Sequence, residues 1–554
     1  MFEELCTVNK NVMNLGFILK HTAQVRPDAI GLVQGERSWT WGELERDANA
    51  IAVALTDLGI SKGDRVLVQS PNNRYMYESQ FAILRTGGVY APINARASTS
   101  ETIQSAQISQ AKAIIVDASC LDNAIAAARE SEYLGAIIST DSFDLNEGVD
   151  AKLFVYDDLV KKYEDHPAVD VAVDRDDHCW HCFTSGTTGV PKQAVHTHGA
   201  LAFTFACRIA DVLPGLDHTN ATLAIAPISH GTGTTTTCCT IKGAKIVLLD
   251  SQKFDVEECW KAIERHRITN MFTVPTILMR MVKDHTIDKY DHSSLRHVMY
   301  AGAPISRPDQ KVAIEKLGKV LVQYYGQAET MGTTATLYPD MHDTDDGNQL
   351  APLGSCGVMR SCTEVGIFDD NMMKVSVGEV GEICTRSAAN FCGYWNDKDA
   401  TEEVFVDGWL KTGDLGKMDE RGFIYIAGRS KQIFKSGGFQ VYPVEICNCL
   451  SEHPAVEEAH VISLPDSEWG EIGVGVVSVK PGMTTTEGEL IELVASKHAS
   501  YKKPRRIFIV DEIPRTDYGK VSPQILKERL LERGLIKKGV NLAAYKANSE
   551  RQIS

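Results

Sequence analysis

Short apolar runs alternate with helical patterns along the first third of the chain. Runs rich in β-branched residues stand at 65–68, 113–116 and 136–138, and each is bounded by polar or glycine-containing turns. Between them, residues 72–85 and 99–110 carry apolar side chains at the three- and four-residue spacing of a helix. Because parallel strands need a crossover connection, this alternation predicts a largely parallel sheet with helices on both faces.

The same alternation resumes after residue 192. Strands are expected at 223–226, 245–249, 271–275, 297–301 and 320–324. The breaks Gly302-Ala303-Pro304 and Gly326-Gln327 follow two of these strands. In open α/β sheets ligands bind at the carboxyl ends of the strands, so these breaks mark a candidate binding edge.

The pattern changes from about residue 350 to 426, where glycines are frequent and apolar positions alternate with a period of two. This predicts a small β-rich subdomain. Helix and strand then alternate again, with Pro443 early in one helix and Thr486 and Glu489 as a capping box before another. We expect an N-terminal domain over 1–429, a C-terminal domain over 430–536 and a polar tail over 537–554.

Charge and composition exclude some classes of partner. The 554 residues include 57 basic and 73 acidic side chains, a net charge of −16, which argues against nucleic acid or an anionic membrane as a partner. No apolar run approaches the roughly 18 residues of a membrane span, and the first residues lack a secretory pattern. Without an export signal, the 14 cysteines are expected to be reduced thiols of a cytoplasmic protein.

One segment has the composition of a polyphosphate-binding loop. Residues 184–192 hold hydroxyls, two glycines and one lysine, with no carboxylate. Glycine lets backbone N–H groups converge on an anion, and Lys192 adds a point charge. It is not a Walker A loop, because Pro191 precedes the lysine. Taken alone, a Gly/Thr surface turn is the simpler interpretation.

The residues before this loop, His178-Cys179-Trp180-His181-Cys182, have Cys-x-x-Cys spacing. A metal or redox site is conceivable, but a second pair of ligands is missing. A strand that leads into the loop is the favoured interpretation.

Four distant positions complement the loop. Tyr325 could lay its ring against a base, and Glu329 could hold Mg²⁺, which favours oxygen ligands. Asp414 could accept hydrogen bonds from both hydroxyls of a ribose. Lys520, after Gly519 on a turn, could project an ammonium into a cleft. Each alone is more commonly an ordinary turn or surface residue.

Together these segments resemble the adenylate-forming superfamily of acyl-CoA synthetases, nonribosomal adenylation domains and beetle luciferases. The match spans residues 37 to 520, with five motifs in the expected order. The resemblance implies a fold with two doubly wound α/β subdomains and a small β-barrel, followed by a small mobile α+β C-terminal domain.

The resemblance also implies a role for each matching position. Lys520, Glu329, His230 and Lys192 would be catalytic, Glu329 would ligate Mg²⁺, and Lys431 would be the hinge. ATP would be bound by Thr184, Ser185, Gly186, Thr187, Thr188, Gly189, Lys192, Gly302, Ala303, Pro304, Tyr325, Gly326, Asp414, Arg429 and Lys520. Coenzyme A would contact Lys435, Gly437 and Gly438, and the acyl pocket would include His230, Gly231, Thr232, Gly326 and Gln327. Gln193 and Gln432 depart from the family pattern, which has glycine and an acid there.

The implied reaction joins a carboxylate to ATP, releasing pyrophosphate, and then passes the acyl group to coenzyme A. The stretches 226–239 and 324–336 hold no formal charge except Glu329 and a protonated His230. Because a buried unpaired ammonium is costly, we expect an acid with an uncharged tail, aliphatic or aromatic. Two alternatives stay open: a ligase that loads a carrier protein, and a non-catalytic nucleotide-binding relative.

Overall fold

The computed structural model describes residues 10–142, 150–184, 191–251, 253–348, 350–515 and 521–536, and of Lys431 only the backbone. The chain forms two compact units. The first contains residues up to 305 together with 309–365 and 385–410, and the second contains 306–308, 366–384 and 411 onward. The boundary predicted at 429/430 stays a prediction.

The first sheet of the first unit has the strand order β21-β11-β10-β5-β4-β6-β7-β8. Its strands are β4 (Arg65–Gln69), β5 (Val89–Ile93), β6 (Ala113–Val116), β7 (Ala136–Ser139), β8 (Lys152–Val155), β10 (His178–Thr184), β11 (Lys192–Thr197) and β21 (Gly393–Tyr394). Neighbours from β10 to β8 are parallel, whereas β11 and β21 are antiparallel additions. The predicted strand at His178–Cys182 is confirmed as part of β10.

Helices connect and cover these strands as the apolar spacing predicts. They include α4 (Arg74–Arg85), α5 (Thr99–Ser109), α6 (Leu121–Glu130) and α7 (Tyr156–Tyr163). Two further helices, α2 (Phe17–Val25) and α3 (Trp41–Asp57), pack against α4, and α3 also packs against α7. Strand β1 (Asn11–Val12) pairs with β9 (Val173–Asp174). The capping box of α3 satisfies two otherwise orphaned backbone N–H groups at Thr40 and Glu43.

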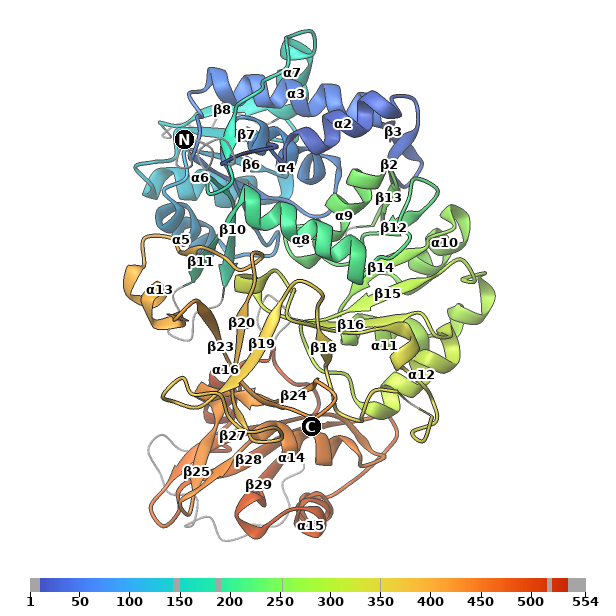
Figure 1. Cartoon of the computed structure of the whole chain (residues 1–554), viewed down its shortest axis with the longest axis vertical. Coiled ribbons are helices and arrows are strands. Elements are labelled where there is room, and N and C mark those ends of the chain that lie inside the picture. Colours follow the sequence, from blue (N-terminus) through green and yellow to red (C-terminus); the bar gives the residue numbers. More distant parts are fainter. Residues whose placement is uncertain are drawn as a thin grey trace, which may run out of the picture. The chain divides into compact units, whose positions relative to one another are not determined.

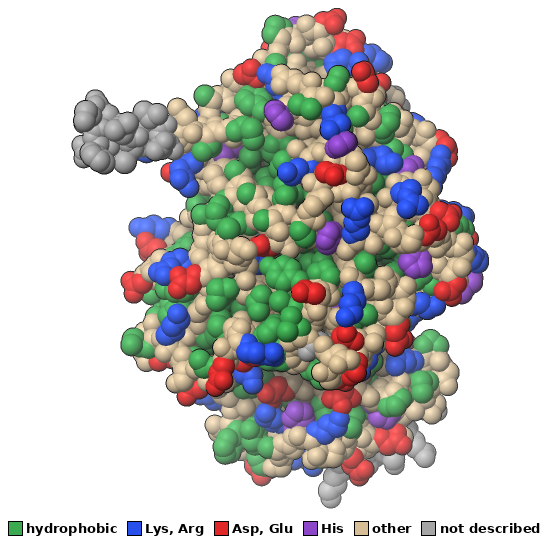
Figure 2. Space-filling view, turned by 45° about the vertical axis from the view of Figure 1, so that its right-hand side comes forward, with side chains coloured by type: hydrophobic (Ala, Val, Ile, Leu, Met, Phe, Trp, Pro, Cys, Tyr) green, Lys and Arg blue, Asp and Glu red, His purple; other side chains and the backbone are tan. Residues whose placement is uncertain are grey.

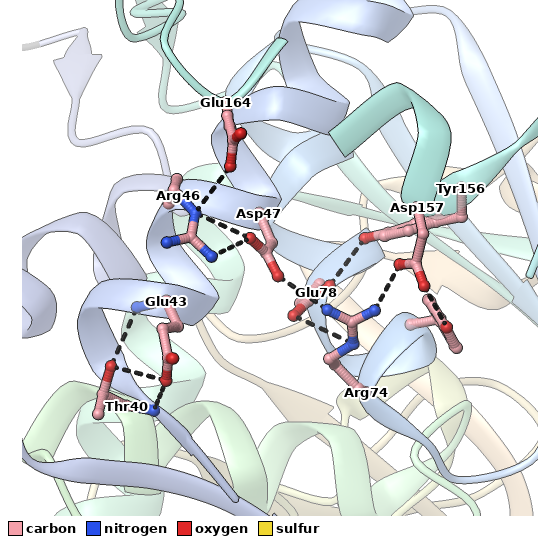
Figure 3. Close-up of polar contacts among 10 residues, drawn as sticks. Thr40, Glu43, Arg46, Asp47, Arg74, Glu78, Tyr156, Asp157 and Glu164 are labelled. Atoms are coloured by element: carbon pink, nitrogen blue, oxygen red, sulfur yellow. Dashed lines mark hydrogen bonds and ion pairs between the residues drawn. The ribbon is translucent and has the colours of Figure 1, made fainter. Parts of the chain in front are cut away.

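A charged network joins α3, α4 and α7 (Figure 3). Arg74 donates to Asp47 at 2.8 Å and to Asp157 at 2.5 Å, and Tyr156 donates to Glu78 at 3.1 Å. Burial raises the pKa of Glu78 well above its usual value, and the nearby Arg74 charge opposes this rise. Loss of one member would strand a buried charge, which typically costs about 3–5 kcal/mol.

The second sheet of the first unit runs in the order β18-β17-β16-β15-β14-β12-β13-β2-β3. Its strands are β2 (Ile30–Gln34), β3 (Arg37–Thr40), β12 (Ala221–Leu223), β13 (Lys245–Leu248), β14 (Asn270–Thr273), β15 (His297–Tyr300), β16 (Leu321–Tyr325), β17 (Ala335–Leu337) and β18 (Gly357–Met359). Strands β2, β13, β12, β14, β15 and β16 run parallel to one another, whereas β3 is antiparallel to β2 and β17 is antiparallel to β16. Helices α10 (Val256–His266), α11 (Pro275–Lys283) and α12 (Arg307–Leu317) accompany these strands. The helices α8 (His198–Asp211) and α9 (Gly231–Lys242) lie between the strands of the two sheets (Figure 1).

The strand predicted at 223–226 is shifted, because β12 ends at Leu223. Beyond Leu223, the side chain of Asn72 forms hydrogen bonds with the backbone. Its amide donates to Ala224 O at 3.0 Å and to Ala226 O at 2.9 Å, and its carbonyl oxygen accepts from Ile228 N at 2.8 Å. The side chain thus replaces a neighbouring strand and leads the chain out of the sheet toward α9.

The β-rich segment is divided between the two units, and the C-terminal region belongs to the second unit. Strands β19 (Glu364–Phe368), β20 (Gly381–Arg386), β23 (Trp409–Met418) and β24 (Phe423–Arg429) are neighbours in that order, and β22 (Phe405–Val406) pairs with β23. Closure of these strands into a barrel stays a prediction. Helix α13 (Lys398–Val404) lies in the first unit.

A second sheet of the second unit has the order β26-β25-β28-β27, with β29 beside β28. Its elements are β25 (Phe434–Ser436), β26 (Phe439–Val441), β27 (Val456–Asp466), β28 (Gly470–Val479), β29 (Arg506–Val510), α14 (Pro443–Ser451), α15 (Glu487–Lys497) and α16 (Pro523–Glu532). Pro443 stands at the first position of α14, and Thr486 and Glu489 form the capping box of α15, so both sequence predictions are confirmed.

The surface agrees with the mixed composition. Acidic and basic side chains are interspersed on the face shown in Figure 2. Across the described ranges, no helix is both long and apolar enough to cross a bilayer. The predicted tail, 537–554, lies outside the described residues.

Candidate active site

Two glycine-containing loops leave the second sheet at the same edge. Strands β15 and β16 are parallel neighbours, and Gly302 and Gly326 follow their carboxyl ends. Gly302 has a φ of +86°, and a Cβ on Gly326 would lie 2.6 Å from the Cα of Gly332. Both positions therefore require glycine. The loop Gly302-Ala303-Pro304 is exposed, and Tyr325 ends β16, so the predicted nucleotide-binding positions border one edge.

His230 lies immediately before α9, in the connection that follows β12. Its Nδ1 is 2.8 Å from the Ser229 hydroxyl. Gly231 begins the helix, and a Cβ there would meet the Phe272 ring at 2.9 Å and the Tyr324 hydroxyl oxygen at 3.3 Å. The glycine thus permits the helix to start against two aromatic rings.

Sequence reasoning did not predict α9, because two glycines and six threonines disfavour a helix. Packing explains it: a Cβ on Gly233 would lie 2.3 Å from Ile228 O. The hydroxyls of Thr234, Thr236, Thr237 and Thr240 accordingly donate to carbonyls of the preceding helical turn. The helix is almost wholly buried, so tertiary packing overrides propensity.

Glu329 lies in a short 3₁₀ turn, η3 (Ala328–Thr330), after β16. The Tyr394 hydroxyl donates to its Oε1 at 2.7 Å, and Phe391 N donates to its backbone oxygen at 2.8 Å. A hydrogen bond to a carboxylate is among the stronger protein hydrogen bonds. The predicted metal ligand is therefore held by a segment more than 60 residues away in the sequence.

Lys192 uses the same tyrosine. Its Nζ lies 4.9 Å from the centre of the Tyr394 ring and 3.7 Å from Asp397 Oδ2. The backbone of Lys192 pairs in register with that of Thr184, at the last paired position of the β10–β11 hairpin. Tyr394 thus brings the predicted phosphate-binding lysine and the predicted metal ligand together.

His196 fixes the spacing between β11 and η3. Its Nε2 lies 2.8 Å from Ala328 O, the residue before Glu329. Burial lowers the pKa of His196 to about 4. The imidazole is therefore neutral near pH 7, and its Nε2–H donates to this carbonyl.

Gln193, the departure from the family pattern beside Lys192, is buried next to His181. Among the described residues neither side chain has a hydrogen-bond partner within normal distance. Burial, with the nearby His178 and Arg65 charges, lowers the pKa of His181 well below its usual value.

The second unit carries the remaining described positions. Asp414 is buried on β23, and Arg429 Nε lies 2.8 Å from its Oδ1. Lys431 lies in the 3₁₀ turn η5 (Ser430–Gln432) directly after β24. The register of β23 with β24 places Asp414 and Arg429 opposite one another.

Gly437 and Gly438 form the turn between β25 and β26, with φ angles of +58° and +86°. Gly437 N donates to Trp469 O at 2.9 Å, and a Cβ on Gly437 would meet the Trp469 ring at 2.8 Å. The exposed Lys435 precedes this turn. Residues 185–189 and Lys520 lie outside the described residues, so their roles stay predictions.

Sequence reasoning missed four residues of the first unit. These are Tyr394, Asp397, His196 and Arg208. The first three contact predicted site residues or their immediate neighbours, which are distant in the sequence. These contacts depend on which strands pair, and a single sequence does not reveal that pairing. Arg208 on α8 looks like one polar residue on an amphipathic helix.

The chain matches known proteins along most of its length. The sequence model for "AMP-binding enzyme" matches residues 19–395, and that for "AMP-binding enzyme C-terminal domain" matches 445–520. This chain belongs to the AMP-binding enzyme family. The resemblance to the adenylate-forming superfamily is confirmed, as is the predicted α/β fold with a large N-terminal and a smaller C-terminal domain.

Members with different substrates are similar to this AMP-binding enzyme. It is 32% identical to "4-coumarate--CoA ligase-like 9" of Oryza sativa subsp. japonica, with 92% of each chain covered. It is 30% identical to "Long-chain-fatty-acid--CoA ligase FadD13" of Mycobacterium tuberculosis, covering 93% of this chain and 98% of that one. The structure of the anthranilate CoA ligase AuaEII with anthranoyl-AMP has a TM-score of 0.84 at 25% identity, covering 95% and 98%.

Proposed function

We propose that this AMP-binding enzyme is an AMP-forming carboxylate–CoA ligase. It activates a carboxylic acid with ATP to an acyl-adenylate and then transfers the acyl group to coenzyme A. The CoA ligases similar to it over nearly the whole chain support the reaction class. They include ligases named for aryl acids and for fatty acids, so these relatives support both an aromatic and an aliphatic tail.

One observation carries the proposal: Tyr394 contacts both Lys192 and Glu329. A cation and a carboxylate that contact the same tyrosine suit a nucleoside triphosphate with its metal. The ammonium attracts phosphate oxygens, and the carboxylate attracts the cation that phosphates carry.

Glu329 fits Mg²⁺ as a ligand. It offers carboxylate oxygens, and the Tyr394 hydroxyl engages only Oε1 in a hydrogen bond, which orients the group as outer hydrogen bonds orient metal ligands. A bound Mg²⁺ supplies charge neutralisation to the phosphates.

In the first half-reaction, an oxygen of the substrate carboxylate attacks the α-phosphorus of ATP. The bond from that phosphorus to the bridging oxygen breaks, and pyrophosphate leaves. Because two anions must approach each other, cationic groups do most of the work. In the proposed roles Lys192 holds the departing phosphates, and Lys520 bridges the carboxylate and the α-phosphate.

In the second half-reaction, the thiol of coenzyme A attacks the acyl carbon. The bond to the AMP oxygen breaks, and AMP leaves with the electron pair, while the thiol proton passes to solvent. We assign His230 to the gate near the acyl carboxylate and the turn of Gly437 and Gly438 to the pantetheine path. The change between the two half-reactions uses Lys431 as hinge.

The test is a panel of acids assayed for pyrophosphate and AMP. Each acid is supplied with ATP and Mg²⁺, with and without coenzyme A, and a phosphopantetheinylated carrier protein replaces coenzyme A in a third series. The proposal predicts acid-dependent pyrophosphate release and thioester formation on free coenzyme A. Thioester formed on the carrier alone would assign the carrier-loading reaction instead, and absence of acid-dependent pyrophosphate would contradict catalysis.

A further inference from the structure

A buried guanidinium stands behind the start of α9. Arg208 on α8 is 1% exposed. Its Nη1 donates to the Tyr324 hydroxyl oxygen at 3.3 Å, its Nη2 donates to Met331 O at 3.3 Å, and its guanidinium carbon lies 4.8 Å from the Tyr324 ring centre. Arg208 therefore acts on Tyr324 both through the hydroxyl and through the ring.

The charges around Arg208 do not balance. The neighbouring Arg360 pairs with Asp211 at 3.3 Å, and burial together with the nearby Arg208 charge lowers the pKa of Arg360. Arg208 makes no ion pair with any described carboxylate, and its Nε lacks a hydrogen-bond partner. Since a buried cation without a counter-charge is costly, the fold leaves it unmatched only where something else compensates.

Unpaired hydroxyls surround the same place. Most threonines of α9 donate to the helix backbone, but Thr235 Oγ1 is buried and has no partner in the described structure. Thr235 stands one helical turn after Gly231, on the face that meets Tyr324. Thr336, also buried and unpartnered, is directly opposite Tyr324 in the pairing of β16 with β17.

This polar group borders the predicted acyl pocket, of which Gly231 is a member. The Tyr324 hydroxyl oxygen would be 3.3 Å from a Cβ on Gly231, the residue after His230. Because that hydroxyl accepts a hydrogen bond from Arg208, its own hydrogen remains to be donated, and the adjacent cation makes it a stronger donor. The sequence predicted a neutral lining from the stretches 226–239 and 324–336. That prediction did not include Arg208, which belongs to a third segment of the chain.

We infer that Tyr324, polarised by Arg208, is a specificity-determining hydrogen-bond donor for the acyl tail. The preferred acid carries an oxygen acceptor in its tail, a hydroxyl, a carbonyl or a second carboxylate. The inference rests on the proposed function and narrows its substrate class. A site built to bind an acceptor discriminates strongly against the analogue that lacks it, because the buried donors are then left unpaired.

The test compares matched pairs of acids by acid-dependent pyrophosphate release. The pairs are 4-hydroxycinnamate with cinnamate, and octanedioate with octanoate, which separate a neutral acceptor from a carboxylate. For the wild-type enzyme, kcat/KM for the oxygenated member of at least one pair is expected to be about tenfold or more above its partner. In Arg208→Met and in Tyr324→Phe the ratio should fall to within about twofold.

Two matched variants serve as controls. Arg265→Met removes an exposed guanidinium paired with Glu36, and Tyr290→Phe removes a hydroxyl that donates to Glu257. Both should keep the wild-type ratio. If Arg208→Met fails to fold, the ratio of kcat/KM in the wild-type enzyme and in Tyr324→Phe still tests the inference.

Equal use of both members of each pair by the wild-type enzyme would overturn the inference and leave the proposed function standing. So would a preference that persists in Tyr324→Phe and Arg208→Met. Absence of pyrophosphate with every acid would overturn the proposed function and this inference together.

Discussion

At the nucleotide end of the candidate site, the side chains that contact Lys192 and Glu329 are held in place, although the buried Gln193 next to Lys192 has no hydrogen-bond partner in the described structure. Tyr394 donates to Glu329, Lys192 rests beside Asp397, and His196 holds the carbonyl before Glu329. At the acyl end, Arg208 Nε and the hydroxyls of Thr235 and Thr336 have no partner in the described structure.

The two ends of the site meet different requirements, one for binding ATP and the other for binding the acid. ATP is the same for every member of the family, so groups fixed in advance by internal contacts suit it. The acid differs between members, and donors left unpaired are suited to reading one particular tail. The comparison predicts that changes at the nucleotide end slow every acid alike, whereas changes at the acyl end alter which acid is preferred.

The largest effect is expected from Lys520, the lysine proposed to bridge the carboxylate and the α-phosphate. Lys520→Ala should lower the rate of adenylate formation about 10²–10³-fold, since a group that stabilises the meeting of two anions is lost. Thioester formation from a supplied acyl-adenylate should be spared. Stopped assays of the two half-reactions measure both rates, and equal loss in both would contradict the division of roles.

A smaller effect is expected from the hydrogen bond that orients Glu329. Tyr394→Phe removes the donor at 2.7 Å but keeps the ring under Lys192. Loss of an outer partner of a metal ligand typically weakens metal binding about 10–100-fold. A Mg²⁺ titration of adenylate formation should shift by this factor for every acid, while Tyr290→Phe leaves it in place. An unchanged Mg²⁺ requirement would remove Tyr394 from the account.

More of the local structure follows from the sequence at the predicted nucleotide end than at the predicted acyl end. The glycine breaks after β15 and β16 and the approach of β10 to the phosphate loop follow from local pattern and composition. Tyr394 could not be found, because its contact with Glu329 depends on the pairing of β21 with β11. The boundary of β12 was wrong because Asn72, about 150 residues earlier, ends the ladder.

Burial explains the other omissions. Helix α9 contradicts local propensity, and only the closeness of Ile228 and Phe272 requires its glycines. Arg208 follows the pattern of an exposed helical residue yet is buried, and no single-sequence signal distinguishes the two cases. Spacing therefore identified the groups proposed to bind the nucleotide, whereas the groups proposed to face the acid come together only when three distant segments pack.

The smallest effect concerns stability rather than rate. The folded chain keeps His196 neutral down to about pH 4, whereas an unfolded chain binds that proton near pH 6.5. The contribution of the neutral His196 to the free energy of unfolding is therefore complete above about pH 6.5. It is lost as the pH falls toward 4, by roughly 1.4 kcal/mol per pH unit. Urea unfolding of the wild type and His196→Gln at pH 7.5 and 5 should show the smaller loss in the variant. Equal losses would contradict a neutral, buried imidazole.

The most direct test of the contrast between the two ends is acid-dependent exchange of labelled pyrophosphate into ATP. It is measured for one panel of acids in the wild type, Lys192→Ala and Arg208→Met. The account predicts that Lys192→Ala lowers every rate by a similar factor and keeps the order of the acids, whereas Arg208→Met changes that order. A reordering by Lys192→Ala, or a uniform decrease in Arg208→Met, would contradict it.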